Sequence, residues 1–229
     1  MQPNVDETTL VVESMPMKRG IFVSFEGNEG CGKSTQIGLL EHACVQLGRT
    51  VVRVREPGGT ALGEEVRHLL KHSPAGEGMC PEAEILLFGA SRAELVRKVI
   101  VPALAADCVV LADRFVDSTT VYQGLGRGLP LDSVHGINAL ATGGLLPDLT
   151  VLLDIDVAGS RARTASRGLG DDRFEREADA FFEKVRAGYL TLAAQAPERF
   201  LVLDAVQEPA TIHQAILGHL SARFHGLHT

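Results

Sequence analysis

The sequence predicts an α/β fold: a five-stranded parallel sheet with helices on both faces and a small mobile lid. Short apolar runs recur along the 229 residues, and helical patterns separate one run from the next. Short, wholly apolar strands are typical of a parallel sheet, because such a sheet is buried on both faces. Polar, turn-rich segments follow the strands, where ligands bind in sheets of this kind. The predicted strands are Ile21–Phe25, Thr50–Val54, Cys108–Leu111, Leu149–Leu153 and Phe200–Leu203.

The segments between the strands have helical periodicity. Pro81 suits the first position of a helix, because proline has no N–H to leave unbonded there. The exception is Ser160–Glu175, which contains four arginines and two glycines and is predicted to be a mobile basic lid over about residues 160–175. Helices are predicted over 37–47, Leu62–Lys71, Glu82–Lys98, Ser118–Gln123, Leu131–Thr142, Ala178–Gln195 and Pro209–Phe224.

Composition limits the class of protein. Hydrophobic residues make up 45% of the chain, which suits one well-buried α/β domain, predicted here over residues 20–229. The formal net charge of −7 argues against nucleic acid as the main partner. No apolar stretch approaches the roughly 18 residues that a membrane span needs, so no membrane partner is expected.

The N-terminus and the cysteines indicate a cytoplasmic protein. Residues 1–19 contain acidic residues and no basic start followed by an apolar core, so they are predicted to be a disordered tail rather than a signal peptide. The four cysteines form no C-x-x-C pair and no zinc spacing. They are expected to be reduced thiols, with Cys31 exposed in a glycine-rich loop.

That loop carries the strongest motif in the chain. Gly27-x-x-x-x-Gly32-Lys33-Ser34 lies between a predicted strand and a predicted helix, which is the context that a P-loop requires. Its backbone N–H groups and the helix start would bind phosphate oxygens, and the Ser34 hydroxyl would bind Mg²⁺. The sequence therefore predicts a P-loop NTPase-like fold that binds ATP through Gly27, Asn28, Glu29, Gly30, Cys31, Gly32, Lys33, Ser34 and Thr35.

A second motif follows the third strand. Val109–Asp113 is an apolar run that ends in a carboxylate, as a Walker B strand does, so Asp113 is predicted to bind Mg²⁺ directly or through water. A turn or helix-capping role for Asp113 is the alternative. Arg114 comes next, and its planar guanidinium suits an anionic acceptor phosphate.

The lid arginines are the predicted source of catalytic positive charge. Phosphoryl transfer spreads negative charge over the transferred oxygens, so catalysis depends on cations around them. The variable P-loop positions contain no arginine, which leaves Lys33 as the fixed cation there. Arg167 is the first choice for the catalytic arginine and Arg163 the second. Some of the four lid arginines are expected to face solvent without a catalytic role.

Two further positions could recognise an acceptor nucleotide. Phe88 and Arg92 are four residues apart in a predicted helix, so they share a face and could stack on a base and bind its edge. Phe88 taken alone is more often a core residue. Glu29 would be repelled by phosphates, but it could accept a hydrogen bond from a sugar hydroxyl.

From Lys18 onward the chain resembles the thymidylate kinases of bacteria. The resemblance is carried by the phosphate loop and by the segments Arg55-Glu-Pro-Gly-Gly-Thr60, Leu87-Phe-Gly-Ala-Ser-Arg92, Asp113-Arg-Phe-Val-Asp-Ser-Thr119, Tyr122-Gln-Gly124 and Pro147-Asp-Leu-Thr150. It implies transfer of the γ-phosphate of ATP to dTMP with Mg²⁺, giving dTDP. Because the P-loop has no arginine, the chain resembles the family members whose catalytic arginine lies in the lid.

The resemblance also implies roles for single residues. Lys33, Asp113, Arg167 and Arg163 would be catalytic, and Ser34 and Asp113 would serve the metal. Arg114 would bind the dTMP phosphate, Phe88 would stack on thymine and Arg92 would reach its O4. Members of the family are usually homodimers, and the 82–98 helix could take part in the interface. The implied dTMP-binding residues are Glu29, Glu56, Phe88, Arg92, Arg114, Ser118, Thr119 and Gln123.

Two alternatives remain at this point. One is a kinase for another nucleoside monophosphate or for a deoxynucleoside. The other is a GTPase or a non-catalytic nucleotide-binding switch. Such a switch would need Asn-Lys-x-Asp to recognise guanine, and the sequence has no such motif.

Overall fold

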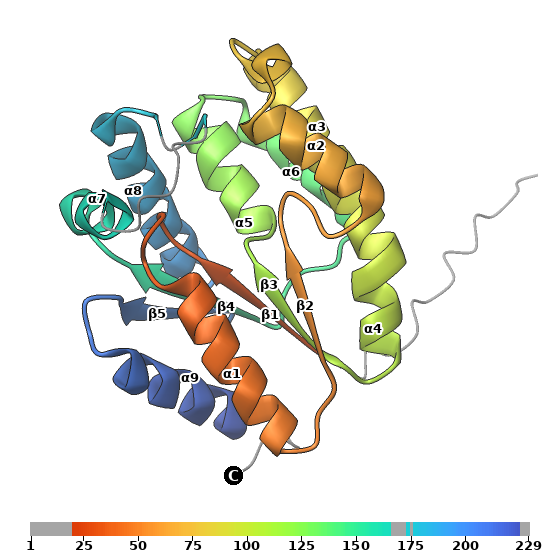
Figure 1. The fold of residues 1–229 in the computed structure, drawn as a ribbon, viewed down its shortest axis with the longest axis vertical. Coiled ribbons are helices and arrows are strands. Elements are labelled where there is room, and N and C mark those ends of the chain that lie inside the picture. The colour runs from red at the N-terminus through yellow and green to blue at the C-terminus, as the bar shows by residue number, and fades with distance from the viewer. Residues whose placement is uncertain (1–19, 166–172, 175, 225–229) are drawn as a thin grey trace, which may run out of the picture.

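The computed structural model describes residues 20–165, 173–174 and 176–224. Five strands form one parallel sheet in the order β2-β3-β1-β4-β5 (Figure 1). The five predicted strands are confirmed, with ends that differ by one or two residues. They are β1 (Ile21–Glu26), β2 (Val51–Arg55), β3 (Val109–Asp113), β4 (Leu149–Asp154) and β5 (Phe200–Asp204).

Helices connect the strands. The predicted 82–98 helix is longer than expected, because a π-helical turn, Val96–Ile100, joins α3 to α4. The predicted 118–123 helix consists of α5 and a π-helical segment, Thr120–Gly126. The α-helices are α1 (Lys33–Gln46), α2 (Ala61–Lys71), α3 (Pro81–Leu95), α4 (Val101–Ala105), α5 (Val116–Thr119), α6 (Leu131–Thr142), α7 (Val157–Ala165), α8 (Asp179–Gln195) and α9 (Pro209–Arg223).

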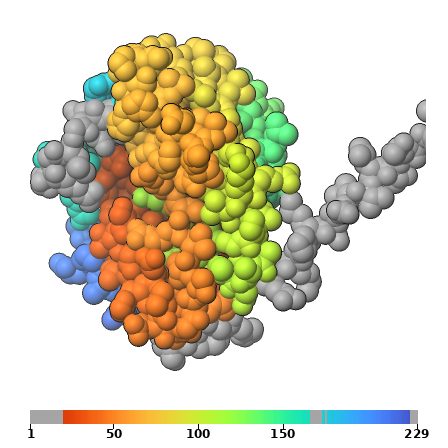
Figure 2. Space-filling view, turned by 45° about the vertical axis from the view of Figure 1, so that its right-hand side comes forward, coloured from red at the N-terminus to blue at the C-terminus, as the bar shows by residue number. Residues whose placement is uncertain are grey.

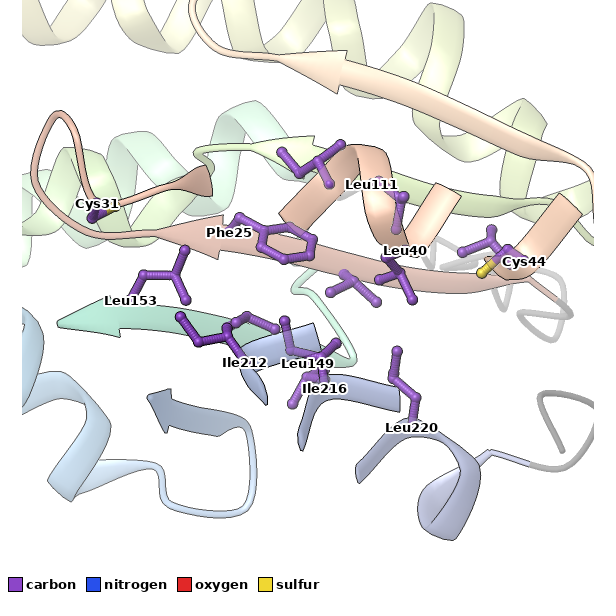
Figure 3. Packing of buried hydrophobic residues seen from close by; sticks show 14 of the residues in the cluster. Phe25, Cys31, Leu40, Cys44, Leu111, Leu149, Leu153, Ile212, Ile216 and Leu220 are labelled. Atoms are coloured by element: carbon purple, nitrogen blue, oxygen red, sulfur yellow. The ribbon is translucent and has the colours of Figure 1, made fainter. Parts of the chain in front are cut away.

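The side chains of the central strand, β1, point alternately to the two faces of the sheet and contribute to the core on both. Phe25 of β1 packs with Leu40 of α1 and Ile216 of α9 on one face (Figure 3). Phe22 of the same strand lies on the opposite face, with Ile100 from the turn before α4. Successive side chains of a strand point to opposite sides, so a continuous apolar strand serves two helix layers.

The first residues of the segment predicted as a mobile lid are helical, although no helix was predicted there. Ser160 belongs to α7, whose first turn is held by Asp156: the Gly159 N–H donates to its Oδ1 at 2.7 Å. An Asp that accepts from a backbone N–H at a helix start is a standard helix-initiating feature. Residues 166–172 and 175 of the predicted lid, and the predicted tail 1–19, lie outside the described residues.

The carboxyl edge of the sheet brings three loops together. The Arg114 N–H donates to the Phe25 carbonyl at 3.1 Å, and the Glu56 N–H donates to the Asp113 carbonyl at 3.0 Å. The residues that follow β3 and β2 are therefore held by backbone hydrogen bonds against the ends of β1 and β3, respectively. Figure 2 shows the surface hollowed between the red residues of the loop after β1 and the orange residues of α2.

Candidate active site

The loop between β1 and α1 has the backbone conformation of a phosphate cradle. Gly27, Gly30 and Gly32 have φ values of 131°, 74° and 101°, which residues with a side chain rarely adopt. A Cβ at Gly27 would lie 2.4 Å from the Leu153 carbonyl oxygen, so no larger residue fits. The positive φ angles turn backbone N–H groups toward one point, at the start of α1, where anions bind.

Lys33 stabilises this loop in the structure. Its Nζ is buried and donates to the carbonyl oxygens of Gly27 at 3.2 Å and Asn28 at 3.1 Å. The expectation that Cys31 is exposed is wrong: 1% of its surface is accessible, and it belongs to the core around Phe25 and Leu40 (Figure 3). The tight loop turns the thiol inward, away from solvent, while its backbone stays at the edge of the sheet.

Helix α7 packs directly on the phosphate loop. Ser160 Oγ donates to the Glu29 carbonyl at 2.6 Å. A Cβ at Gly30 would lie 3.3 Å from the Arg163 Cβ, so Arg163 begins beside the loop. The backbone of the second-choice catalytic arginine is thus beside the phosphate loop.

Two other lid arginines make structural contacts. Arg161 donates to Asp179 at 3.0 Å and stacks over Phe182, so it faces α8. Arg173 donates to Glu84 at 2.6 Å, on the side of α3. Arg167, the first choice for the catalytic role, lies outside the described residues. The catalytic role of Arg163 or Arg167 stays a prediction.

Asp113 and Arg114 occupy the turn after β3. Asp113 is paired in register with Phe25 of β1, so its carboxylate follows the strand next to the one that enters the phosphate loop. Arg114 has φ 71°, a left-handed conformation that costs a residue with a side chain about 1–3 kcal/mol. Non-glycine residues held in this conformation cluster at functional sites, which favours a functional role for Arg114.

The Arg114 guanidinium joins the phosphate loop to the neighbouring pocket. Its Nη2 donates to Glu29 Oε1 at 2.9 Å, and its Nη1 donates to Ser118 Oγ and Tyr189 Oη, each at 3.2 Å. It also stacks over the Tyr122 ring, with Cζ 5.1 Å from the ring centroid. Burial raises the pKa of Glu29, but the positive charges of Arg114 and Lys33 outweigh it and hold that pKa well below its ordinary value.

A pocket opens beside Arg114 and holds all eight residues predicted to bind the acceptor. Its walls come from the phosphate loop, the loop after β2, α2, α3 and the segment after β3. Phe174, near the end of the predicted lid, also lines the pocket. The pocket is lined by Glu29, Glu56, Pro57, Lys71, Phe88, Arg92, Arg114, Ser118, Thr119, Tyr122, Gln123 and Phe174.

Arg92 is held rigidly in the wall of this pocket. Its exposure is 1%, its Nε donates to Glu56 Oε2 at 2.8 Å, and its Nη1 donates to Asn138 Oδ1 at 2.7 Å. Nη2 donates to Thr119 Oγ1 at 2.8 Å. A bidentate, buried pair of this kind fixes the plane of the guanidinium. Glu56 and Thr119 therefore position Arg92 in addition to lining the pocket.

Several residues at or beside the pocket were not predicted from the sequence. The Tyr122 hydroxyl lines the pocket, is buried and makes no hydrogen bond within the described residues. Tyr122 lies in the Tyr-Gln-Gly segment, for which the resemblance implies a role for Gln123 alone. Tyr189, Phe174 and Glu84 carry no local sequence signal, because they reach the site only through the packing of distant elements.

Glu26, the last residue of β1, was also missed. It is fully buried, and its carboxylate accepts from the Phe115 N–H at 2.7 Å, from Ser118 Oγ at 2.6 Å and from Tyr189 Oη at 2.8 Å. Burial and the negative charge of Asp117 raise its pKa to about 7, although Arg114 and the two hydroxyls act in the opposite direction. Glu26 therefore holds the turn that carries Arg114, and it retains its proton to a higher pH than an exposed glutamate does.

This raised pKa predicts a pH-dependent stability. The folded protein holds the Glu26 proton more tightly than the unfolded chain, so the carboxyl contributes stability below pH 4.5 that is lost as pH rises to about 7. Glu26→Gln cannot ionise, so its free energy of unfolding relative to the wild type should rise by about 3 kcal/mol from pH 4.5 to pH 7. Urea unfolding at several pH values measures this difference.

Glu64→Gln is the matched control. The N–H of Gly59 lowers the pKa of the Glu64 carboxyl, so its titration lies below pH 4.5 and the difference from wild type should be constant between pH 5 and 8. A constant difference for Glu26→Gln as well would show that Glu26 is already ionised at pH 5.

Comparison with known proteins gives a consistent result. The family model described as thymidylate kinase matches residues 25–216. The chain is 47% identical over 212 residues to the thymidylate kinase of Geotalea daltonii, covering 88% of this chain and 99% of that protein. It is 46% identical over 199 residues to the thymidylate kinase of Pelotomaculum thermopropionicum, covering 87% of this chain and 92% of the relative.

A solved structure supports the same assignment. The crystal structure of thymidylate kinase from Ehrlichia chaffeensis superposes with a TM-score of 0.72 and 32% identity, over 88% of this chain and 98% of that one. Within the described residues no helix is long and apolar enough to span a membrane. The phosphate loop, the turn after β3 and the adjoining pocket are thus found in a chain that matches one family along most of its length. This chain belongs to the thymidylate kinase family.

Proposed function

We propose that the chain transfers the γ-phosphoryl group of ATP to dTMP, forming dTDP and ADP, at the carboxyl edge of its sheet. The observation that carries this proposal is the Glu29–Arg114 ion pair at 2.9 Å. It joins the phosphate loop to the acceptor pocket, so two nucleotides bound there would meet through their phosphates. Phosphoryl transfer requires that meeting, because the attacking and leaving oxygens must lie roughly in line.

The phosphate loop is the ATP side of the site. The backbone N–H groups from Gly27 to Thr35 would bind the phosphate oxygens, supported by the partial positive charge at the start of α1. Lys33 would neutralise the β- and γ-phosphates, exchanging its present carbonyl partners for phosphate oxygens. Arg163 or Arg167 would supply the remaining positive charge around the transferred group.

The oxygen donors present fit Mg²⁺ held together with a nucleotide. Ser34 is exposed at the first turn of α1, and the partly exposed Asp113 carboxylate follows β3. No group of three or more His, Cys, Asp or Glu that could hold a metal occurs among the described residues. That suits Mg²⁺, which is usually bound by one or two carboxylates, waters and substrate phosphates. Bound with ATP, it would neutralise charge on the β- and γ-phosphates.

The pocket beyond Arg114 is the dTMP side. Arg114 would bind the acceptor phosphate, and Glu29 would accept a hydrogen bond from the deoxyribose 3′-hydroxyl. Phe88 would stack on thymine, and Arg92 would bind the edge of the base. Because Glu56 and Asn138 already fix Arg92, recognition of the base would cost little ordering of that side chain.

A panel of acceptors tests this function. The full chain with ATP and Mg²⁺ is given dTMP, dUMP, dCMP, dGMP or thymidine, and ADP release is measured. We expect the highest kcat/KM for dTMP. If dTMP is inert and another monophosphate is phosphorylated, the acceptor assignment is wrong. Hydrolysis of GTP without any acceptor would instead indicate a nucleotide switch.

We also propose that the chain is a homodimer through α3 and α6. These helices pack against each other, and each exposes a leucine: Leu86 is 59% and Leu140 is 85% accessible. Exposed apolar side chains on adjoining helices favour an interface. Sedimentation equilibrium of the full chain measures the assembled mass.

All four thiols are free, which suits a cytoplasmic location.

A further inference from the structure

Two aromatic rings from distant parts of the chain line the acceptor pocket. Phe88 comes from α3 and Phe174 from the segment before α8. Their ring centroids are 5.8 Å apart and their planes meet at 65°, an edge-to-face contact. Phe174 is 9% exposed. The ring that was predicted to stack on a base therefore has an aromatic neighbour in the same pocket.

Arg173 fixes the position of Phe174. Its Nε donates to the Leu70 carbonyl at 3.0 Å and its Nη2 donates to Glu84 Oε2 at 2.6 Å. Its guanidinium lies over the Phe174 ring, with Cζ 4.5 Å from the centroid. The arginine thus binds to both helices that flank the pocket, α2 and α3, and holds its neighbour's ring between them.

The carboxylate that holds Arg173 also holds the base pocket. Glu84 is 1% exposed and accepts from Gln123 Nε2 at 2.8 Å, and Arg127 pairs with it at 3.3 Å. It lies one helical turn before Phe88 on α3, so both project from the same face. A buried carboxylate needs such partners, because an unpaired buried charge is strongly destabilising. Glu84 therefore links Gln123 on one side of the pocket to Arg173 and Phe174 on the other.

We propose that Phe174 determines acceptor selectivity, as a second aromatic wall of the base pocket, and that Arg173 is the positioning residue that holds it there. This inference rests on the proposed function, because it takes the pocket to be the acceptor site. A ring at this position adds apolar contact for a small pyrimidine and limits the space for a larger base. Phe174 is not among the residues for which the sequence indicated a role in binding.

Phe174→Ala tests the wall directly. We expect the KM for dTMP to rise about tenfold, equivalent to about 1.4 kcal/mol, with the KM for ATP unchanged. The ratio of kcat/KM for dGMP to that for dTMP should rise, because the pocket becomes larger. Phe174→Tyr should restore most of the wild-type KM. Calorimetric titration with dTMP alone measures the same loss without catalysis.

Phe224→Ala is the matched control. It removes the ring of another Arg-Phe pair, in which Arg223 lies over Phe224 at 5.5 Å, at the end of α9 and away from the pocket. Its KM values and acceptor ratio should equal those of the wild type. If Phe224→Ala shifts them as much as Phe174→Ala does, general loosening of the fold explains the effect and the proposal fails.

A double-mutant cycle tests the role of Arg173. If Arg173 acts only by holding Phe174, Arg173→Leu should raise the KM for dTMP about as much as Phe174→Ala, and the double variant should add little. Full additivity would overturn the positioning role. A wild type that phosphorylates dTMP while Phe174→Ala keeps its KM and acceptor ratio would refute only this inference. A wild type inactive on dTMP would refute the proposed function itself.

Discussion

Arg167→Ala is expected to lower kcat by roughly 10³- to 10⁵-fold while changing the KM for dTMP little. An arginine that neutralises the transferred phosphoryl group is worth this much in related phosphoryl-transfer enzymes, and it acts mainly in the transition state. The phosphate loop has no arginine, and Arg161 and Arg173 are engaged with Asp179 and Glu84. Steady-state kinetics with saturating ATP and varied dTMP separate kcat from KM.

Arg161→Ala provides the control, since it removes a guanidinium from the same segment that faces α8 rather than the phosphate loop. It should keep the wild-type kcat. Arg163→Ala decides between the two remaining candidates, because the Arg163 Cβ lies beside Gly30. A large loss in Arg163→Ala together with a normal kcat in Arg167→Ala would assign the catalytic role to Arg163.

Arg114→Ala is expected to lower kcat/KM for dTMP by about 100-fold or more, with a far smaller change in the KM for ATP. Hydrogen bonds to a charged group contribute about 1.5–3 kcal/mol each, and a guanidinium can bind a phosphate through two of them. Loss of the guanidinium also removes the ion-pair partner of a carboxylate. Here the residue left behind is Glu29, a carboxylate that would then face the acceptor phosphate alone. Initial rates with each substrate varied in turn measure the effect.

Comparison with Arg114→Gly separates chemistry from folding. Both variants lack the guanidinium, but glycine adopts φ 71° without strain and alanine does not. Arg114→Gly should therefore be the more stable variant, by about 1 kcal/mol, and equally poor with dTMP. If the glycine variant regains the wild-type KM for dTMP, the loss in Arg114→Ala comes from backbone strain, and the guanidinium does not bind the acceptor.

Local patterns were sufficient to predict the frame of the molecule. The five strands, the glycine loop and the turn with Asp113 and Arg114 are each contained in short stretches, and hydrophobic periodicity and turn chemistry act over such lengths. The eight residues predicted to bind the acceptor could be named because they lie in segments that resemble those of a known family. The structure places all eight in one pocket beside the loop.

The sequence predictions differed from the structure where packing against a neighbouring element overrode the preference of a short segment. No helix was predicted at Ser160, because glycine and arginine surround it, but Asp156 begins α7 there. Cys31 was expected to be exposed because loops generally are, yet the turn of the glycine loop directs the thiol into the core. The start of α7 and the burial of the Cys31 thiol both depend on the direction in which the chain leaves the preceding strand.

The sequence by itself determined the order of strands and helices, the phosphate loop and the residue types available for binding. Tertiary structure alone decided which carboxylates the arginines contact, which carboxyl has a raised pKa and which second ring lines the pocket. Arg173 meets Glu84, and Glu26 meets Tyr189, only after elements far apart in the chain have packed together. The physical reason is that ion pairing and pKa depend on burial and distance, and neither is defined before the sheet and its helices assemble.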